Sequence, residues 1–219
     1  VAAPVVDDAG RLVGVVTVDD VVHIIDEEAE EDLLKLAGVQ ETDLYSAVLD
    51  TTKSRFTWLL INLFTAVAAS IVIAIFEDTL QRIVALAVLM PIVASMGGNA
   101  GTQTLTVAVR AIAMRDLSSS NALRFVGKEI LVGLANGLMF AVVAGAVAWF
   151  WFDAPSIGFI IAAAMVINLL VAALSGALVP LGLEKIGVDP AVASSVVLTT
   201  VTDVIGFFAF LGLATVFLL

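Results

Sequence analysis

Residues 91–111 read PIVASMGGNAGTQTLTVAVRA and lie within a long apolar segment, Ile83–Ala113. Proline lacks the amide hydrogen that a helix needs, and each glycine lowers helix stability by about 1 kcal/mol relative to alanine. Backbone that leaves the helix inside a membrane is tolerated only where protein buries it or water lines it. We therefore expect the helix to break near Pro91, Gly97 and Gly98 and to leave carbonyl groups free.

The same stretch is rich in side-chain oxygen atoms, which belong to Asn99, Thr102, Gln103 and Thr106. Oxygen atoms are the ligands that hard cations prefer, and a free carbonyl at Gly98 would add to them. One interpretation is therefore one wall of an ion path. The alternative is a kinked helix packed tightly on a neighbour, because Gly97 and Gly101 form a GxxxG pattern.

Five apolar segments fill most of residues 53–219, and 61% of the whole chain is hydrophobic. The segments are Phe56–Phe76, Ile83–Ala113, Phe125–Phe152, Ile157–Leu183 and Ala191–Leu219. Each has the roughly 20 residues that an α-helix needs to cross the hydrocarbon core. The sequence thus predicts an all-α membrane protein with five transmembrane helices, not a soluble helical bundle.

The basic residues are distributed unevenly about these segments. If the segments cross the membrane in turn, nine of the 10 basic residues lie on the side of the N-terminus, and Arg82 alone lies opposite. Lys and Arg are enriched in cytoplasmic loops. We therefore expect a multi-pass protein of the cell inner (plasma) membrane, with a cytoplasmic N-terminus and the C-terminus outside.

Asp203 lies deep in the last apolar segment, where an ionisable residue is costly and usually marks a pathway. Helical spacing places it on one face with small and polar residues, namely Ser195, Thr199, Thr202 and Gly206. Hydroxyl groups around a carboxylate suit a hard, partly hydrated cation. The alternative is a structural aspartate at a contact between helices.

Three further polar residues fall within the apolar segments. Glu129 either faces a cavity or pairs with a nearby basic residue at the cytoplasmic rim. Asn136 and Asn168 fit either a pathway or hydrogen bonds between helices. The GxxxG pattern of Gly133 and Gly137 indicates close helix packing.

The N-terminal residues 1–50 hold 13 of the 21 acidic residues but 2 of the 10 basic ones. Phosphates would be repelled, so we expect cations and not nucleic acid as partners. Residues 1–25 have the pattern of strand, turn, strand and helix, with Thr17 or Asp19 as the helix cap. Two strands and a helix cannot bury a core alone, so we expect the tail of a larger domain whose N-terminal part is missing.

An acidic helix is expected over residues 26–52, with carboxylates nearly in series at Asp26, Glu27, Glu28, Glu30, Glu31 and Asp32. Like charges this close repel one another, and a divalent cation would bridge them. Glu28, Glu31 and Asp32 are the candidate ligands, and binding there would act as a local electrostatic switch. The alternative is an ordinary solvated helix face.

The chain has no cysteine and a single histidine, which excludes disulfides and thiolate metal sites and argues against Ser-His-Asp chemistry. An enzyme is therefore not expected. An intramembrane aspartyl hydrolase would need two close carboxylates, so Asp203 would have to pair with its copy in a dimer. Hard oxygen ligands favour Mg²⁺ over softer metals, although a transporter of broader selectivity that accepts Mn²⁺ or Co²⁺ stays open.

Several motifs together resemble the MgtE family of magnesium channels and transporters. Proline followed by GGNAGTQ and a basic residue resembles that family's second span, and VVLTTVTDVIGFFAFLG resembles its last span with the pore aspartate. VVDDAGRLVGVVTVDDVV resembles the end of a cystathionine-β-synthase (CBS) domain, and EEAEEDLLKLAG resembles the connecting "plug" helix. The resemblance divides the chain into a CBS remnant (1–25), a cytoplasmic plug helix (26–52) and a pore domain (53–219).

The resemblance implies a homodimer with a Mg²⁺ pore on its twofold axis. Asp203 of each subunit would hold a hydrated Mg²⁺, with Asn99 and backbone oxygens of the glycine motif close by. Mg²⁺ would move down its electrochemical gradient, and cytoplasmic Mg²⁺ would close the pore. The N domain and most of the CBS pair, which normally sense that Mg²⁺, would be missing from this chain.

Overall fold

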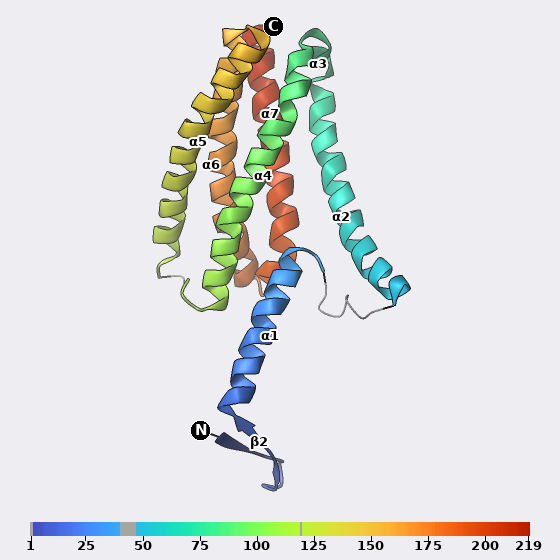
Figure 1. The fold of residues 1–219 in the computed structure, drawn as a ribbon, viewed down its shortest axis with the longest axis vertical. Helices are drawn as coiled ribbons and strands as arrows, with labels where there is room; N and C mark the ends of the chain where they lie inside the picture. Colours follow the sequence, from blue (N-terminus) through green and yellow to red (C-terminus); the bar gives the residue numbers. More distant parts are fainter. Residues whose placement is uncertain (1, 40–46, 119) are drawn as a thin grey trace. The chain divides into compact units, whose positions relative to one another are not determined.

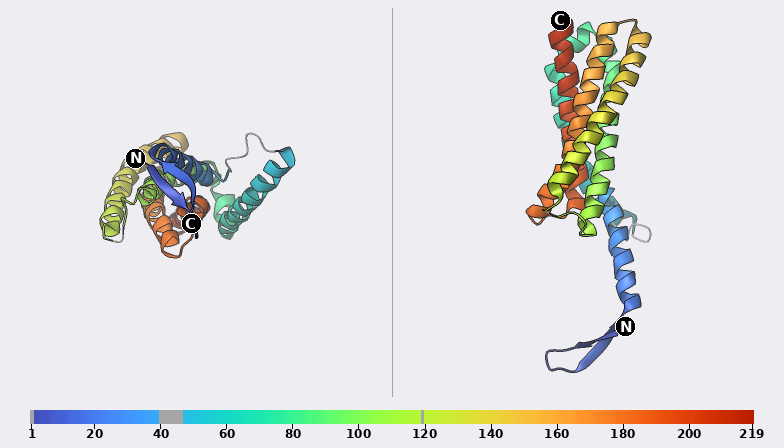
Figure 2. Two further views of the ribbon diagram at one scale, coloured as in Figure 1. Left: turned by 90° about the horizontal axis from the view of Figure 1, so that it is seen from below. Right: turned by 90° about the vertical axis from the view of Figure 1, so that its left-hand side faces the viewer.

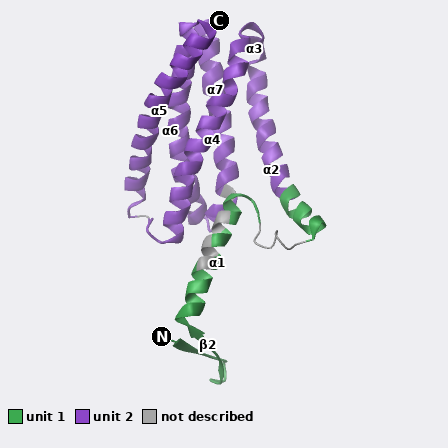
Figure 3. Cartoon of the chain, in the orientation of Figure 1, with its two compact units in different colours: residues 1–56 green, residues 57–219 purple. Residues whose placement is uncertain are grey.

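The computed structural model describes residues 2–39, 47–118 and 120–219, and the side chains of residues 26, 28, 29, 32, 33 and 193 are outside the description. The chain divides into two compact units, Val1–Phe56 and Thr57–Leu219, which Figure 3 shows in different colours. The first unit holds a hairpin and an acidic helix, and the second holds most of the apolar residues.

The N-terminal hairpin pairs β1 (Ala2–Val6) with β2 (Leu12–Thr17) in antiparallel register, as the sequence predicts. Its turn begins at Asp7, whose carboxylate accepts hydrogen bonds from the amides of Ala9 and Arg11 at 3.0 and 2.9 Å. The bond from the Arg11 amide is the main reason that the pKa of Asp7 lies below its usual value. The turn is thus held by its own aspartate.

Helix α1 (Val18–Leu36) begins after Thr17, whose hydroxyl accepts a hydrogen bond from the Asp20 amide at 3.3 Å. In return the Asp20 carboxylate accepts one from the Thr17 amide at 2.7 Å, which completes a capping box. The predicted cap at Thr17 is confirmed. None of the described side chains of residues 1–56 is buried, so the described part of this unit has no core of its own.

The acidic helix does not extend over residues 26–52 as predicted. Helix α1 ends at Leu36, and Gly38 then takes a φ of +69°, a left-handed conformation that commonly ends a helix. Residues 40–46 lie outside the described residues. Residues 48–52 belong to the first long apolar helix, which therefore begins before the predicted start of the pore domain.

Among the described residues, 48–218 form six helices, and five of them are long and apolar enough to cross a membrane. The helices are α2 (Val48–Ile75), the short α3 (Glu77–Arg82), α4 (Val84–Ala113), α5 (Ala122–Phe152), α6 (Pro155–Lys185) and α7 (Pro190–Leu218). Figure 1 shows the five long helices running in alternating directions, with α3 in the turn between α2 and α4. The predicted all-α membrane architecture with five transmembrane helices is confirmed.

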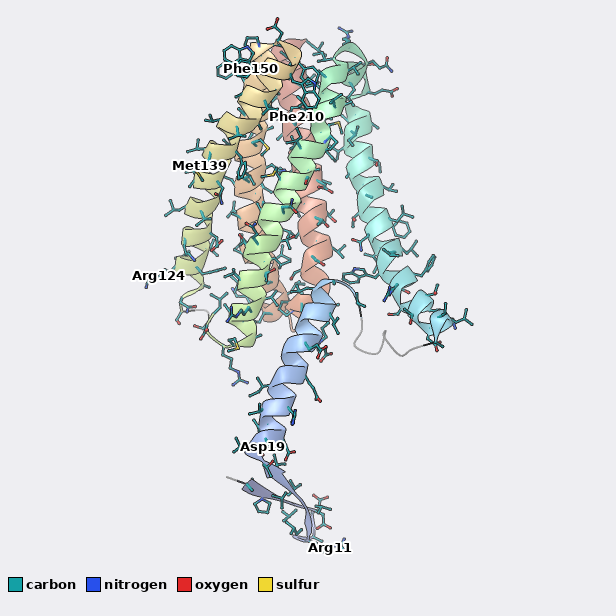
Figure 4. The ribbon with its side chains drawn as sticks, in the orientation of Figure 1. Arg11, Asp19, Arg124, Met139, Phe150 and Phe210 are labelled. Atoms are coloured by element: carbon teal, nitrogen blue, oxygen red, sulfur yellow. The ribbon has the colours of Figure 1, made fainter. Side chains whose placement is uncertain are left out.

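Helix α6 lies at the centre of the second unit and packs against α4, α5 and α7 (Figures 1 and 2). Ile161 and Met165 of α6 are at most 1% exposed. Phe210 of α7 is also buried, whereas Met139 and Phe150 of α5 point away from the bundle (Figure 4). The core therefore runs along α6, and the outer face of α5 is left for lipid.

Small residues let α5 and α6 approach closely. A Cβ atom added at Gly133 would lie 2.6 Å from the Cβ of Ala173, and one added at Gly137 would lie 3.2 Å from the Cα of Val166. A larger side chain at Gly133 would clash, and one at Gly137 would require the backbone of α6 to shift. The packing role predicted for this GxxxG pattern is confirmed.

Helix α2 is exposed along most of its length. Of its described residues, Ala69 is buried and the others are partly or fully exposed. The corner after α2 is anchored on α7 by two contacts. The rings of Phe76 and Phe208 meet edge to face with their centroids 5.7 Å apart, and the hydroxyls of Thr79 and Thr215 lie 2.8 Å apart. Most of the apolar surface of α2 is thus free to meet lipid or another chain.

Candidate ion site

Helix α4 runs unbroken from Val84 to Ala113, with Pro91 inside it. The predicted break at Gly97 and Gly98 is therefore wrong, and so are the free carbonyls expected from it. The cost of glycine in a helix applies to water, where an unwound backbone can bond to solvent. In a membrane the helix itself satisfies the backbone, so the glycines remain helical.

The continuous helix gives α4 two different faces. The open face carries exposed polar side chains at helical spacing, which we call the polar stripe: Ser95, Asn99, Thr102 and Thr106. The hydroxyls of Thr102 and Thr106 each donate to the carbonyl one turn back, at 2.8 Å. Because these bonds stay within α4, the acceptor lone pairs of the stripe remain available on the open side.

The buried face of α4 is shaped by Gly97. A Cβ atom added there would overlap the side-chain amide of Asn168 on α6, and one added at Gly206 on α7 would lie 2.8 Å from the same nitrogen. Asn168 is fully buried and donates from Nδ2 to the Val93 carbonyl at 2.8 Å, while its Oδ1 has no partner among the described residues. One amide therefore fills the space that two glycines leave and joins three helices.

The two other glycines of the motif have opposite surroundings. A Cβ atom added at Gly101 would lie 2.7 Å from Cδ1 of Leu198 on α7, so a larger residue there would require the buried Leu198 side chain to shift. A Cβ atom added at Gly98 would meet nothing within 4 Å. The backbone of Gly98 is therefore accessible beside the polar stripe.

These contacts also set the relative depth of Asn99 and Asp203. Helices α4 and α7 run in opposite directions, and Gly97 and Gly206 touch the same side chain. At about 1.5 Å per residue, Asn99 lies about 3 Å beyond Gly97, and Asp203 lies about 4.5 Å from Gly206 toward the same end. The two polar residues thus lie within about one helical turn of the same depth.

Asp203 is half-buried, and no hydrogen bond reaches its carboxylate from the residues that the structure describes. Thr199 is also half-buried and donates to the Ser195 carbonyl at 3.0 Å. Thr202 is fully buried and donates to the Thr199 carbonyl at 3.1 Å, and Gly206 is buried as well. The predicted polar face of this helix is therefore divided, because Thr202 turns into the bundle and does not share the open side.

A second polar site lies between α4, α5 and α6, in a cavity of about 120 Å³. Glu129 is 6% exposed and lines this cavity together with Gln103, Thr104 and Asn136. The Thr104 hydroxyl donates to Glu129 Oε2 at 3.0 Å, and Lys128 Nζ lies 3.6 Å from Oε1. Glu129 thus both faces a cavity and pairs with a basic neighbour, the two alternatives that the sequence offered.

The acidic residues considered for metal regulation belong to the first unit. The side chains of Glu28 and Asp32 lie outside the described residues. Glu31 is exposed, and its Oε1 lies 3.0 Å from Nζ of Lys35. Within the described ranges no three His, Cys, Asp or Glu side chains converge on a metal site.

Sequence reasoning missed Thr104, the hydroxyl donor to Glu129. Thr104 follows Gly97 and Gly101 at helical spacing and therefore belongs to the buried face of α4. That spacing was the available signal. The spacing was overlooked because the glycines were expected to break the helix, and residues on either side of a break do not share a helical face.

Comparisons with known proteins place the chain among transporters. Residues 90–213, more than half of the chain, match the MgtE family, described as divalent cation transporters. Three curated relatives named magnesium transporter MgtE come from Bacillus subtilis, Enterococcus faecalis and Thermus thermophilus, and are 34%, 36% and 38% identical over 98–99% of this chain. The chain covers 48% of each relative, about half of their length. It belongs to the MgtE family of divalent cation transporters.

Proposed function

We propose that this chain is the membrane-spanning part of a Mg²⁺ transporter, in which Mg²⁺ moves down its electrochemical gradient along the polar stripe and past Asp203. The observation that carries the proposal is the Asp203 carboxylate. It lies within a membrane span, is half-exposed, lacks a donor among the described residues and shares the depth of Asn99. An ionised group inside a membrane needs a partner. A cation in the path supplies it.

The chemistry of the site fits an ion that keeps its water. Mg²⁺ loses water reluctantly and is commonly held through one or two carboxylates with several waters still bound. The carboxylate of Asp203, the amide oxygen of Asn99 and the Thr199 hydroxyl can all accept hydrogen bonds from such waters. The relatives named magnesium transporters support this choice of ion.

A second copy of the chain would complete the path. In one chain the polar stripe is exposed, and so is most of α2. Polar groups that face lipid would have no partner, so the stripe must face water or protein. Two copies related by a twofold axis would enclose a path with two Asp203 carboxylates, and a cation between them would relieve their repulsion.

Orientation and regulation belong to the same proposal. The excess of basic residues on the N-terminal side supports a cytoplasmic N-terminus in the inner (plasma) membrane, with the C-terminus outside. Cytoplasmic Mg²⁺ would bind the acidic face that includes Glu28, Glu31 and Asp32 and favour a closed state. Because the relatives are transporters, we propose no enzymatic activity for Asp203.

The test is Mg²⁺ flux into liposomes that contain the purified protein. Asp203→Asn keeps the size of the side chain and removes its charge. Two unit charges about 4 Å apart interact by about 4 kcal/mol near a protein surface, so we expect flux to fall roughly 100-fold or more. Flux through folded Asp203→Asn that equals the parent's would refute the assignment of the path.

The matched control is Asp153→Asn, which removes the same charge in the turn between α5 and α6. Asp153 has a φ of +49°, a conformation that asparagine adopts readily, so this variant is expected to fold. Its Mg²⁺ flux should stay within about twofold of the parent's, since surface substitutions away from a site have small effects.

A transporter of broader selectivity is the second candidate, because the family is described by divalent cations in general. Oxygen ligands also accept Mn²⁺, and Co²⁺ is the softer competitor. In the same liposomes, Mg²⁺ flux should be little affected by an equal concentration of either ion if Mg²⁺ is preferred. Halving of the flux by equal Mn²⁺ would favour the broader function.

A further inference from the structure

We propose that the cavity between α4, α5 and α6 is a second binding site for a hard divalent cation, with Glu129 as its charged ligand. The cavity is lined by the buried carboxylate of Glu129, the hydroxyl of Thr104 and the amides of Gln103 and Asn136. These groups come from α4 and α5, while α6 closes the cavity with apolar side chains. The proposal does not depend on the role of Asp203.

The protein satisfies Glu129 only in part. An ionised carboxylate offers about four lone-pair positions. Thr104 occupies one of them at 3.0 Å, and Lys128 Nζ, at 3.6 Å from Oε1, is beyond the usual range of a hydrogen bond. A buried charge with so few partners is costly. The adjoining cavity provides room for further partners of the Glu129 carboxylate.

The size of the cavity suits an ion with part of its water. The volume of about 120 Å³ leaves room for several water molecules. A Mg²⁺ ion bound directly to Glu129 would keep several waters, as it usually does in proteins. Those waters would donate to the side-chain oxygens of Gln103, Thr104 and Asn136.

Lys128 provides a second test of the proposal, because its ammonium group lies beside Oε1 of Glu129. The Lys128 side chain is 69% exposed, so it can move away into solvent when a cation binds. Two positive charges at one carboxylate repel each other. Removing the charge of Glu129 should therefore weaken cation binding, whereas removing the charge of Lys128 should strengthen it.

Electron paramagnetic resonance can locate the ion with Mn²⁺, which takes the same oxygen ligands as Mg²⁺. The chain has no cysteine, so one introduced cysteine carries a nitroxide label. Leu131→Cys places the label on α5 two residues from Glu129, at a side chain that is 67% exposed. The matched control is Val142→Cys, which is 72% exposed and lies three turns, or about 16 Å, farther along the same face.

Both labels are measured in the full chain in a zwitterionic detergent, with Asp203→Asn present so that the proposed path holds no tightly bound Mn²⁺. We expect Mn²⁺ to broaden the spectrum at position 131 in a saturable way that Mg²⁺ reverses, and to affect position 142 much less. Glu129→Gln keeps the size of the side chain and an acceptor for Thr104. It should raise the half-saturating Mn²⁺ concentration at least tenfold.

Lys128→Gln should lower the half-saturating Mn²⁺ concentration severalfold. The proposal is overturned if position 131 shows no saturable broadening, if Glu129→Gln leaves the broadening unchanged, or if Lys128→Gln weakens it. Because Lys128 is exposed, its variant tests the site even if Glu129→Gln does not fold. Mg²⁺ flux with and without Asp203→Asn is a separate measurement. A negative result at the Glu129 site would therefore leave the proposed path unaffected, and a negative flux result would leave the Glu129 site unaffected.

Discussion

The two faces of α4 show how neighbouring glycines can serve different ends. On the buried face, Asn168 and Leu198 fill the places where side chains of Gly97 and Gly101 would stand. On the open face, a Cβ atom added at Gly98 would meet nothing within 4 Å, and this position lies beside the polar stripe. Gly97 and Gly98 are adjacent in sequence, so the surroundings and not the residue type determine what each glycine does.

The largest difference between the faces should appear in stability. Gly97→Ala adds a methyl group that overlaps the Asn168 amide, and overpacking of this kind costs about 1–3 kcal/mol. The Cβ atom of Gly98→Ala would meet nothing within 4 Å, so stability should stay nearly unchanged. Thermal unfolding in detergent measures both. Equal loss in the two variants would show that the faces do not differ in packing.

A second variant tests the buried face from the side of α6. Asn168→Leu removes the bond to the Val93 carbonyl and brings a branched side chain between two glycines. We expect a loss of about 0.6–2 kcal/mol, the range measured for hydrogen bonds between membrane helices. Mg²⁺ flux should also fall, because the contact sets the depth of Asp203 against α4. Asn136→Leu, at a half-buried position, is the control and should destabilise less.

The smallest change in stability is expected on the open face. Thr102→Val and Thr106→Val remove hydroxyls whose hydrogen bonds, among the described residues, stay within α4, so stability should change by less than about 0.5 kcal/mol. Mg²⁺ flux should nevertheless fall severalfold, since the stripe loses oxygens that would bind the ion's waters. Unchanged flux in the double variant would mean that the polar stripe does not line the path.

The five spans could be predicted from sequence because a long apolar segment has one low-energy state in a membrane, the helix. The same physics explains the main error. The break expected at Gly97 and Gly98 rested on helix propensities in water, which the membrane overrides. The start of α2 at Val48 was missed because polar residues extend that helix beyond its apolar part.

For the candidate site, the sequence could indicate single residues but not the contacts between them. Asp203 stood out, since a carboxylate in an apolar segment is rare. The contact of Asn168 with Gly97 and Gly206 could not be seen, because three helices distant in sequence meet there and no local pattern pairs them. The surroundings of Glu129 depend in the same way on α4, which supplies Thr104.

The Asn168 contact also bears on how the helices of the second unit can move. Neither Gly97 nor Gly206 has a side chain that could bend aside, so a slide of α4 past α7 would press backbone against the amide. Helices α4, α6 and α7 should therefore behave as one stiff body, in which Asn99 and Asp203 keep their relative depth. In the proposed dimer, opening and closing of the path would then come from tilting of this body against the second copy and not from rearrangement of its interior.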